Sequence, residues 1–280
     1  MRSIIFTLLL ISSSLSWSSD ISIGGVSLVI PKPEGFSPVT PKMAVLYEAQ
    51  KQFVAPTNEE FVTFIPDDVV EMVLKDEIPE LPRRFAVQTA KNLVNVTVTN
   101  SDFLSFKKII KSQNTELMKK VEAQLPELMG KINEGMKEQY EVDLALSVSQ
   151  MVLMPAHEET DRTLSYSMLV RYDMKDEMGN PAPFVSVVTA TFVHVKGKVL
   201  FLYSYAEESA LEWSRKASHE WASSVVNSNP SGLQESIKET VPSSVSGIDW
   251  GQVAVKAIIG AFIGLIIGLF GWVKNRAKKS

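Results

Sequence analysis

Alternating hydrophobic and polar positions predict a set of strands in the second half of the chain. Period-two alternation marks Val142–Val148 and Leu164–Tyr172, and Phe184–Val195 with Lys198–Tyr205 predicts a hairpin. The stretch Lys198–Tyr205 is apolar at successive positions, which is typical of a central strand covered on both faces. Three extended segments are expected earlier in the chain, at Ile21–Ile30, Phe61–Ile65 and Phe85–Val98.

Apolar residues that recur every three or four positions predict helices around these strands. The longest such stripe runs from Ser101 to Tyr140, and Pro126 is expected to kink or split it because proline has no amide hydrogen to donate. Three further helices are expected, at Met43–Phe53, Asp67–Lys75 (with Asp67 as its cap) and Glu207–Val226. Antiparallel strands with long helices packed on one face make an α+β layer fold.

The order of these elements is similar to a known fold. A long helix, an antiparallel meander and a closing helix (the last strand and helix reading VLFLYSYAEESALEWSRKASHEWASSVV) follow one another over residues 84–227. This order resembles the Mog1/PsbP-like fold of small exported bacterial domains. The resemblance implies a binding or assembly-accessory role rather than an enzyme, and it names no ligand.

The N-terminus has the pattern of a secretory signal peptide. Arg2 precedes the apolar run Ile4–Ile11, and serines follow, with Ser16 and Ser18 at the small-residue positions before a cleavage site. Eight apolar residues span only about 12 Å as a helix, which is too short to cross a hydrocarbon core of about 30 Å. Residues 1–18 are therefore expected to direct export and to be removed.

The C-terminus has the pattern of a membrane anchor. Residues 253–273 are apolar except for Lys256, a length that fits one transmembrane helix. Trp250 and Trp272 stand near its two ends as expected interfacial anchors, and Lys274 and Arg276 begin a basic tail. By the positive-inside rule, the tail (274–280) is cytoplasmic. We therefore expect a single-pass type I protein of the cell inner membrane, with an exported domain (19–227) in the periplasm and a flexible stalk (228–252).

Glycines recur along one face of this apolar segment. They stand at spacings of four, four and three residues, at Gly260, Gly264, Gly268 and Gly271. Such a stripe lets another helix backbone approach closely, which predicts association with a second copy or with another envelope protein. The alternative is that glycine is simply common in membrane helices. A pore is disfavoured, because no polar residue lies between Ala257 and Val273 to line it.

Composition narrows the chemistry and the partners. The chain has no cysteine, which excludes disulfides, thiolate nucleophiles and thiolate metal sites and fits a bacterial envelope protein. Residues 19–252 hold 22 basic and 32 acidic residues, a net charge of −10. Nucleic-acid binding needs clustered Lys and Arg, so no nucleic-acid partner is expected. No cofactor-binding motif is present, and no cofactor is expected.

Few residues are arranged for catalysis. His157 and Glu158 begin a stretch that resembles half of a metalloprotease motif, but Asp161 stands where the second histidine would be needed. His194 is expected to be a cross-strand neighbour, and His219 has no second histidine one turn away. The favoured interpretation is a non-enzymatic binding or assembly-accessory protein. The alternative is an envelope hydrolase whose site is built from dispersed residues around His157 and Glu158.

Overall fold

The structure is a computed structural model, and it describes residues 18–77, 79–140, 145–175, 180–230 and 247–277, with the backbone alone for 18, 136, 139, 140 and 269–277. The expected signal peptide lies outside these ranges apart from Ser18. Most of the expected stalk (231–246) and the end of the basic tail (278–280) also lie outside them.

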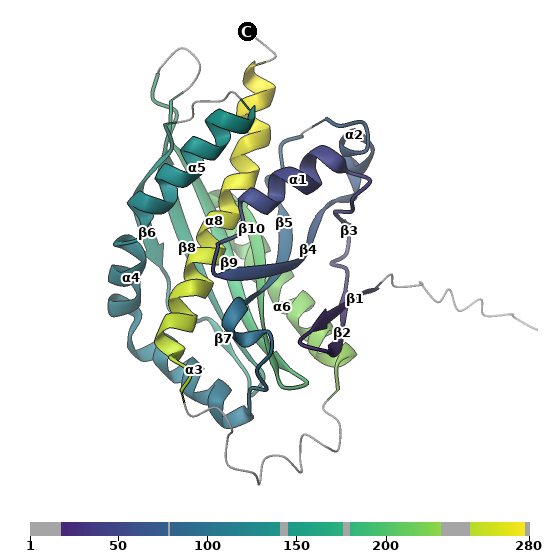
Figure 1. The fold of residues 1–280 in the computed structure, drawn as a ribbon, viewed down its shortest axis with the longest axis vertical. Coiled ribbons are helices and arrows are strands. Elements are labelled where there is room, and N and C mark those ends of the chain that lie inside the picture. The colour runs from purple at the N-terminus through teal and green to yellow at the C-terminus, as the bar shows by residue number, and fades with distance from the viewer. Residues whose placement is uncertain (1–17, 78, 141–144, 176–179, 231–246, 278–280) are drawn as a thin grey trace, which may run out of the picture.

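One antiparallel sheet organises the described part of the chain (Figure 1). Its strand order is β3-β4-β5-β10-β9-β8-β6, with the two-residue strand β7 paired to β8. The strands are β3 (Phe36–Pro38), β4 (Asn58–Pro66), β5 (Arg84–Ala90), β6 (Ser147–Leu153), β7 (Glu158–Glu159), β8 (Thr163–Asp173), β9 (Phe184–Val195) and β10 (Lys198–Glu207). The expected α+β class is confirmed, and β10 is a central strand as its composition predicts.

Helices cover both faces of the sheet, so the expectation of helices on one face is wrong. One face packs against α6 (Leu211–Ser228), which follows a 3₁₀ turn, and against a hairpin of β1 (Ser18–Ile23) and β2 (Val26–Pro31). The other face carries α1 (Ala44–Gln52), α3 (Asn100–Ser112), α4 (Asn114–Glu122), α5 (Leu125–Tyr140) and α8 (Trp250–Ala277). The physical reason is that central strands such as β10 are apolar on both faces, and each face needs a cover.

The long helical stretch is three helices rather than one. Thr99 caps α3 in a capping box, because its hydroxyl accepts a bond from the Asp102 amide (3.1 Å) while the Asp102 carboxylate accepts one from the Thr99 amide (3.0 Å). The helix is interrupted at Gln113, which the sequence does not predict, and again just before Pro126. Pro126 is the second residue of α5, where the missing amide hydrogen costs nothing.

Three other expected elements differ from the structure. The segment after Pro66 is a 3₁₀ turn (Asp67–Val69) and the single turn α2 (Val70–Val73), and Asp67 lies inside the turn rather than capping it. Strand β5 ends at Ala90, and 94–98 is not a strand. Strand β6 begins at Ser147, while the first expected residues of that strand (142–144) lie outside the described ranges.

The loss of the strand at 94–98 is explained by contacts from Lys198, a residue distant in the sequence. The Lys198 ammonium donates to the carbonyls of Val94 (2.8 Å) and Val96 (2.9 Å). These carbonyls are therefore satisfied by a side chain instead of a neighbouring strand. Alternation of valines alone could not reveal that competition.

The first residues expected in the stalk belong to the folded domain. Helix α6 continues to Ser228, and Asn229 is fully buried. The Asn229 side chain accepts a hydrogen bond from the Val29 amide (3.0 Å) and donates one to the Val29 carbonyl (2.7 Å). This pairing mimics a strand partner for β2 and fixes the end of α6 to the hairpin.

Candidate functional site: a groove filled by the C-terminal helix

Helix α8 packs on the sheet between other helices. We call the space that it fills the groove, and the sheet residues beneath it the groove floor. In Figure 1 α8 runs the length of the sheet, with α3, α4 and α5 on one side and α1 on the other. Residues Trp250–Gly268 have a mean hydropathy of 1.9 and are long and apolar enough to cross a membrane, yet 78% of that window is buried inside the structure. The expected anchor is thus also a core helix of the domain in this conformation.

The glycine stripe of α8 faces the sheet. A Cβ atom added at Gly264 would overlap the hydroxyl of Tyr205, and one added at Gly260 would lie 2.8 Å from Gln88 Oε1. At Gly268 the same atom would lie 3.1 Å from the carbonyl oxygen of Leu81. Real Cβ atoms do not approach as closely as those at positions 260 and 264 would, so Gly260 and Gly264 are what allows α8 to lie at this depth, while the contact at Gly268 is tight.

Donors from the sheet reach the backbone of α8 through this gap. Tyr203 donates its hydroxyl to the Ala257 carbonyl (2.8 Å), and Tyr172 donates to the Phe262 carbonyl (3.1 Å). Asn58 donates to the Lys256 carbonyl at 3.2 Å. These contacts recognise helix backbone, which any helix presents, and not the side chains of α8.

A polar network links Asn58, at the start of β4, through β5 to other residues of β4. Asn58 donates to Gln88 Oε1 (3.0 Å), and Gln88 in turn donates to Glu60 Oε2 (3.0 Å). Thr63 donates to the other Glu60 oxygen at 2.9 Å. Burial raises the pKa of Glu60 above its usual range, against the opposing effect of these hydrogen bonds and of the Arg84 charge.

Two groups of the groove floor are buried without a hydrogen-bond partner among the described residues. Arg84 is 1% exposed and its Nη2 has no partner, although its guanidinium lies 3.9 Å from the centre of the Tyr205 ring. The Tyr205 hydroxyl, aimed at Gly264, also has no partner. An unpaired buried polar group costs about 1–3 kcal/mol, so the floor is more polar than a permanent cover of apolar helix requires.

Of the other predicted site residues of this segment, the structure describes the side chain of Trp250 alone. Trp250 packs its ring 5.5 Å from that of Phe106, inside the domain. Gly271, Trp272, Lys274 and Arg276 lie on the last turns of α8, where side chains are outside the described part. Helix α8 begins three residues before the expected span, because Asp249 accepts a bond from the Gln252 amide (3.0 Å) and so caps the helix.

The residues of the hydrolase alternative border a separate cleft. A cavity of about 570 Å³ lies between the α3–α4 corner and the segment from Leu153 to Glu159, with His157 on its wall. Desolvation against that wall, and then the charge of Arg215, lower the pKa of His157. His219 on α6 lies with its Nδ1 2.6 Å from Glu158 Oε1, a pairing across 61 residues that sequence spacing cannot reveal. Tyr166 lines the cleft, and its buried hydroxyl has no partner among the described residues.

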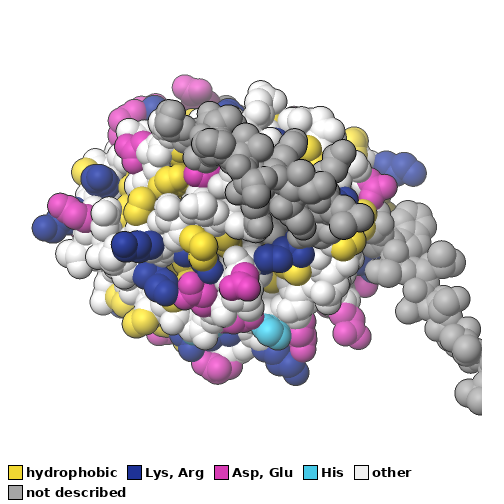
Figure 2. All heavy atoms as spheres, turned by 90° about the horizontal axis from the view of Figure 1, so that it is seen from below, with side chains coloured by type: hydrophobic (Ala, Val, Ile, Leu, Met, Phe, Trp, Pro, Cys, Tyr) yellow, Lys and Arg dark blue, Asp and Glu magenta, His cyan; other side chains and the backbone are white. Residues whose placement is uncertain are grey.

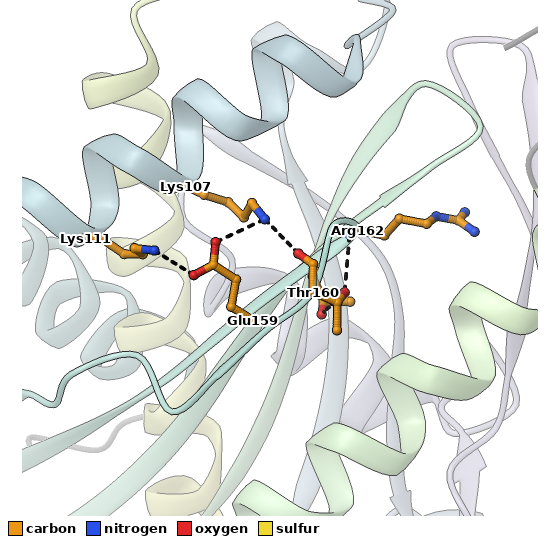
Figure 3. A network of polar contacts seen from close by, with 6 residues as sticks. Lys107, Lys111, Glu159, Thr160 and Arg162 are labelled. Atoms are coloured by element: carbon orange, nitrogen blue, oxygen red, sulfur yellow. Dashed lines mark hydrogen bonds and ion pairs between the residues drawn. The ribbon is translucent and has the colours of Figure 1, made fainter. Parts of the chain in front are cut away.

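Charged side chains tie helix α3 to β7, two residues along the chain from His157 (Figure 3). Lys107 and Lys111 both contact the Glu159 carboxylate, at 3.1 and 2.6 Å. Lys107 also donates to the carbonyl of Thr160 (2.7 Å). The bond from Lys111 lowers the pKa of Glu159, which stays ionised and holds the two elements together.

The face of the molecule seen from below carries positive and negative side chains side by side. Figure 2 shows Lys and Arg side chains interspersed with Asp and Glu there. Among the described residues, no three His, Asp or Glu side chains are grouped closely enough to hold a metal ion. His194 stacks on Phe103 (5.3 Å between ring centres), and its Nε2 lies 2.8 Å from the Val98 carbonyl oxygen, inside the core.

Comparison with known proteins finds likeness in structure only. No family model matches the sequence, and no curated protein matches it. Among solved structures, the chain is similar to cyanobacterial PsbP (CyanoP) from Synechocystis sp. PCC 6803, with 12% identity, a TM-score of 0.30, and coverage of 76% of this chain and 94% of that one. It is also similar to the Ran-binding protein Mog1p of Saccharomyces cerevisiae, with 11% identity, a TM-score of 0.26, and coverage of 76% and 93%. The matches agree with the Mog1/PsbP-like resemblance that the order of elements indicates, and at these TM-scores they transfer no ligand or partner.

Proposed function

We propose that this protein is a non-enzymatic binding or assembly-accessory protein that α8 anchors in a membrane. The observation that carries the proposal is that Trp250–Gly268 is long and apolar enough to cross a membrane, although the helix belongs to a folded domain. When α8 crosses the bilayer, the sheet face that it covers in this structure is free to bind a partner. The basic residues after Val273 orient the chain with its domain outside the cytoplasm, in the periplasm of a bacterial cell.

The test is a topology measurement in cells. Because the chain has no cysteine, each introduced thiol is unique. Full-length variants Lys108→Cys, on the exposed side of α3, and Ser280→Cys, at the tail, are treated with a membrane-impermeant maleimide before and after lysis. We expect labelling at position 108 in intact spheroplasts, labelling at 280 only after lysis, and retention of both variants in carbonate-washed membranes. Labelling at 280 in intact spheroplasts, or release by carbonate, would contradict the proposal.

A second candidate function is a hydrolase, and one observation favours it. His157 and Glu158 both line one cavity, and the Glu158 carboxylate is paired with the imidazole of His219. If the protein is a hydrolase of this kind, His157→Ala abolishes its cellular function without lowering the melting temperature. A His157→Ala variant that retains function excludes the hydrolase.

A further inference from the structure

Strand pairing is interrupted at one edge of the large sheet. Pairing with β8 ends at Leu153 of β6 and resumes at Glu158 of β7, so Tyr166 of β8 has no paired residue in these two edge strands. Pro155, inside the interruption, has no amide hydrogen to donate to a strand. The cavity of about 570 Å³ that His157 lines lies at this interruption, and the corner between α3 and α4 forms its opposite wall.

Two polar atoms of residues that line this cavity are buried without a hydrogen-bond partner among the described residues. One is the hydroxyl of Tyr166, a residue that is 2% exposed, and the other is Oδ1 of Asn114, the first residue of α4. Such atoms are rare in native proteins, because each one loses its hydrogen bonds to water and gains none in return. Two of them at one cavity, from a strand and from a helix, indicate that a bound molecule completes their hydrogen bonds.

The two atoms define the hydrogen bonds that this molecule makes. A side-chain amide oxygen can only accept, so Asn114 Oδ1 requires a donor. The Tyr166 hydroxyl can donate, because burial raises the pKa of Tyr166 above its usual value and keeps the hydroxyl protonated. A neutral amide supplies both an N–H donor and a carbonyl acceptor.

The charged groups on the described wall of the cavity are already paired. Lys111 contacts Glu159 at 2.6 Å (Figure 3), and Glu158 lies 2.6 Å from Nδ1 of His219. Desolvation lowers the pKa of His157, which is therefore neutral at pH 7. A charged ligand would thus find no unpaired counter-charge on this wall. The other lining side chains offer apolar contact, and they are Ile110, Leu153, Met154, Pro155 and Ala156.

We propose that this cavity binds a small uncharged amide with an apolar body, which donates its N–H to Asn114 and accepts a hydrogen bond from Tyr166. The volume of the cavity lies within the range of about 300–1,000 Å³ that is typical of small-molecule sites. Binding here is separate from membrane anchoring, because no described residue of α8 lines the cavity. It also differs from the hydrolase candidate, since Asn114 and Tyr166 hold the ligand and break no bond in it.

The experiment measures the binding of benzamide to the full-length protein in a neutral detergent, by saturation-transfer NMR at pH 7. Benzamide is uncharged and joins an amide to an apolar ring, and benzoate is a charged molecule of the same shape. The variants Tyr166→Phe and Asn114→Leu each remove one of the two unpartnered atoms, so neither should lose stability through a broken hydrogen bond. Tyr205→Phe is the matched control, because its buried hydroxyl also lacks a partner among the described residues but does not line this cavity.

We expect benzamide to bind, with a dissociation constant that rises about five- to tenfold in Tyr166→Phe and in Asn114→Leu and stays unchanged in Tyr205→Phe. Benzoate should bind more weakly than benzamide. No saturation transfer to benzamide, an equal rise in Tyr205→Phe, or binding of benzoate as tight as that of benzamide would overturn the proposal. Because the measurement uses no membrane, each of these results stands whether or not α8 anchors the protein.

Discussion

Replacing Gly264 by alanine tests whether the glycine stripe serves docking on the sheet. The added Cβ would overlap the Tyr205 hydroxyl and would lie 2.9 Å from ring atom Cε1, so either the ring or α8 must move. Overpacking of this kind costs about 1–3 kcal/mol. A shift of α8 would also weaken the hydrogen bonds from Tyr203 and Tyr172, each worth about 1 kcal/mol. Against this, alanine gains about 1 kcal/mol of helix propensity over glycine.

The net expectation is that Gly264→Ala lowers the free energy of unfolding by about 1–3 kcal/mol. The matched control is Gly130→Ala on α5, where an added Cβ meets nothing within 4 Å and the same propensity gain should stabilise by about 1 kcal/mol. Urea unfolding of both full-length variants in vesicle-free buffer, followed by circular dichroism, gives the two values.

A double-mutant cycle locates the cause. If the clash is with Tyr205, then adding Gly264→Ala to a Tyr205→Ala protein should cost nothing, because the ring that it meets is gone. Stabilisation by Gly264→Ala alone, equal to that of Gly130→Ala, would refute the packing of the glycine stripe against the sheet.

Three further predictions concern the groove floor and the cap of α3. Tyr203→Phe should lower the free energy of unfolding by about 1 kcal/mol, because it removes a hydrogen bond to the α8 backbone. Tyr205→Phe should leave the free energy of unfolding unchanged or raise it, because its hydroxyl has no partner among the described residues. Equal losses for the two variants in urea titrations would contradict this. The raised pKa of Glu60 means that the folded state binds a proton more tightly than the unfolded state does, so the free energy of unfolding should fall as pH rises from the usual carboxyl range through the raised value. Glu60→Gln should flatten this pH profile. An unchanged slope in that variant would show that another group is responsible. Thr99→Ala should cost about 1 kcal/mol and lower Tm by about 2–4 °C in calorimetry, through loss of the capping box, and an unchanged Tm would show that the cap contributes nothing.

Periodicity predicts most of the meander and the final helix, because those signals are local. Strands β8, β9 and β10 and helix α6 lie within a few residues of their expected bounds. The false strand at 94–98 depends on a contact from a distant residue, because the Lys198 ammonium donates to the Val94 carbonyl. A pattern of apolar residues carries no information on such contacts.

The sequence predicts only part of the candidate site. The glycine spacing marks a face of close approach, but it does not say whether a helix or a sheet approaches. The partners of Gly260 and Gly264 are Asn58, Gln88 and tyrosines of β10, each more than fifty residues away from the glycine that it contacts. A membrane span and a buried core helix have the same composition, so hydropathy alone could not predict that α8 would lie in the domain.

The most direct test of the account asks whether locking α8 in the groove abolishes membrane association. In the full-length Asn92→Cys/Lys256→Cys variant, a short bis-maleimide links the two positions, whose native side chains meet at 3.0 Å. The cross-linked (closed) protein is then floated with phosphatidylcholine vesicles, beside the unclosed protein and both single-cysteine controls. We expect the unclosed protein and both controls to float and the closed protein to stay in the soluble fraction. Flotation of the closed protein at the level of the unclosed one would contradict the proposal that α8 leaves the sheet to anchor the protein in the membrane.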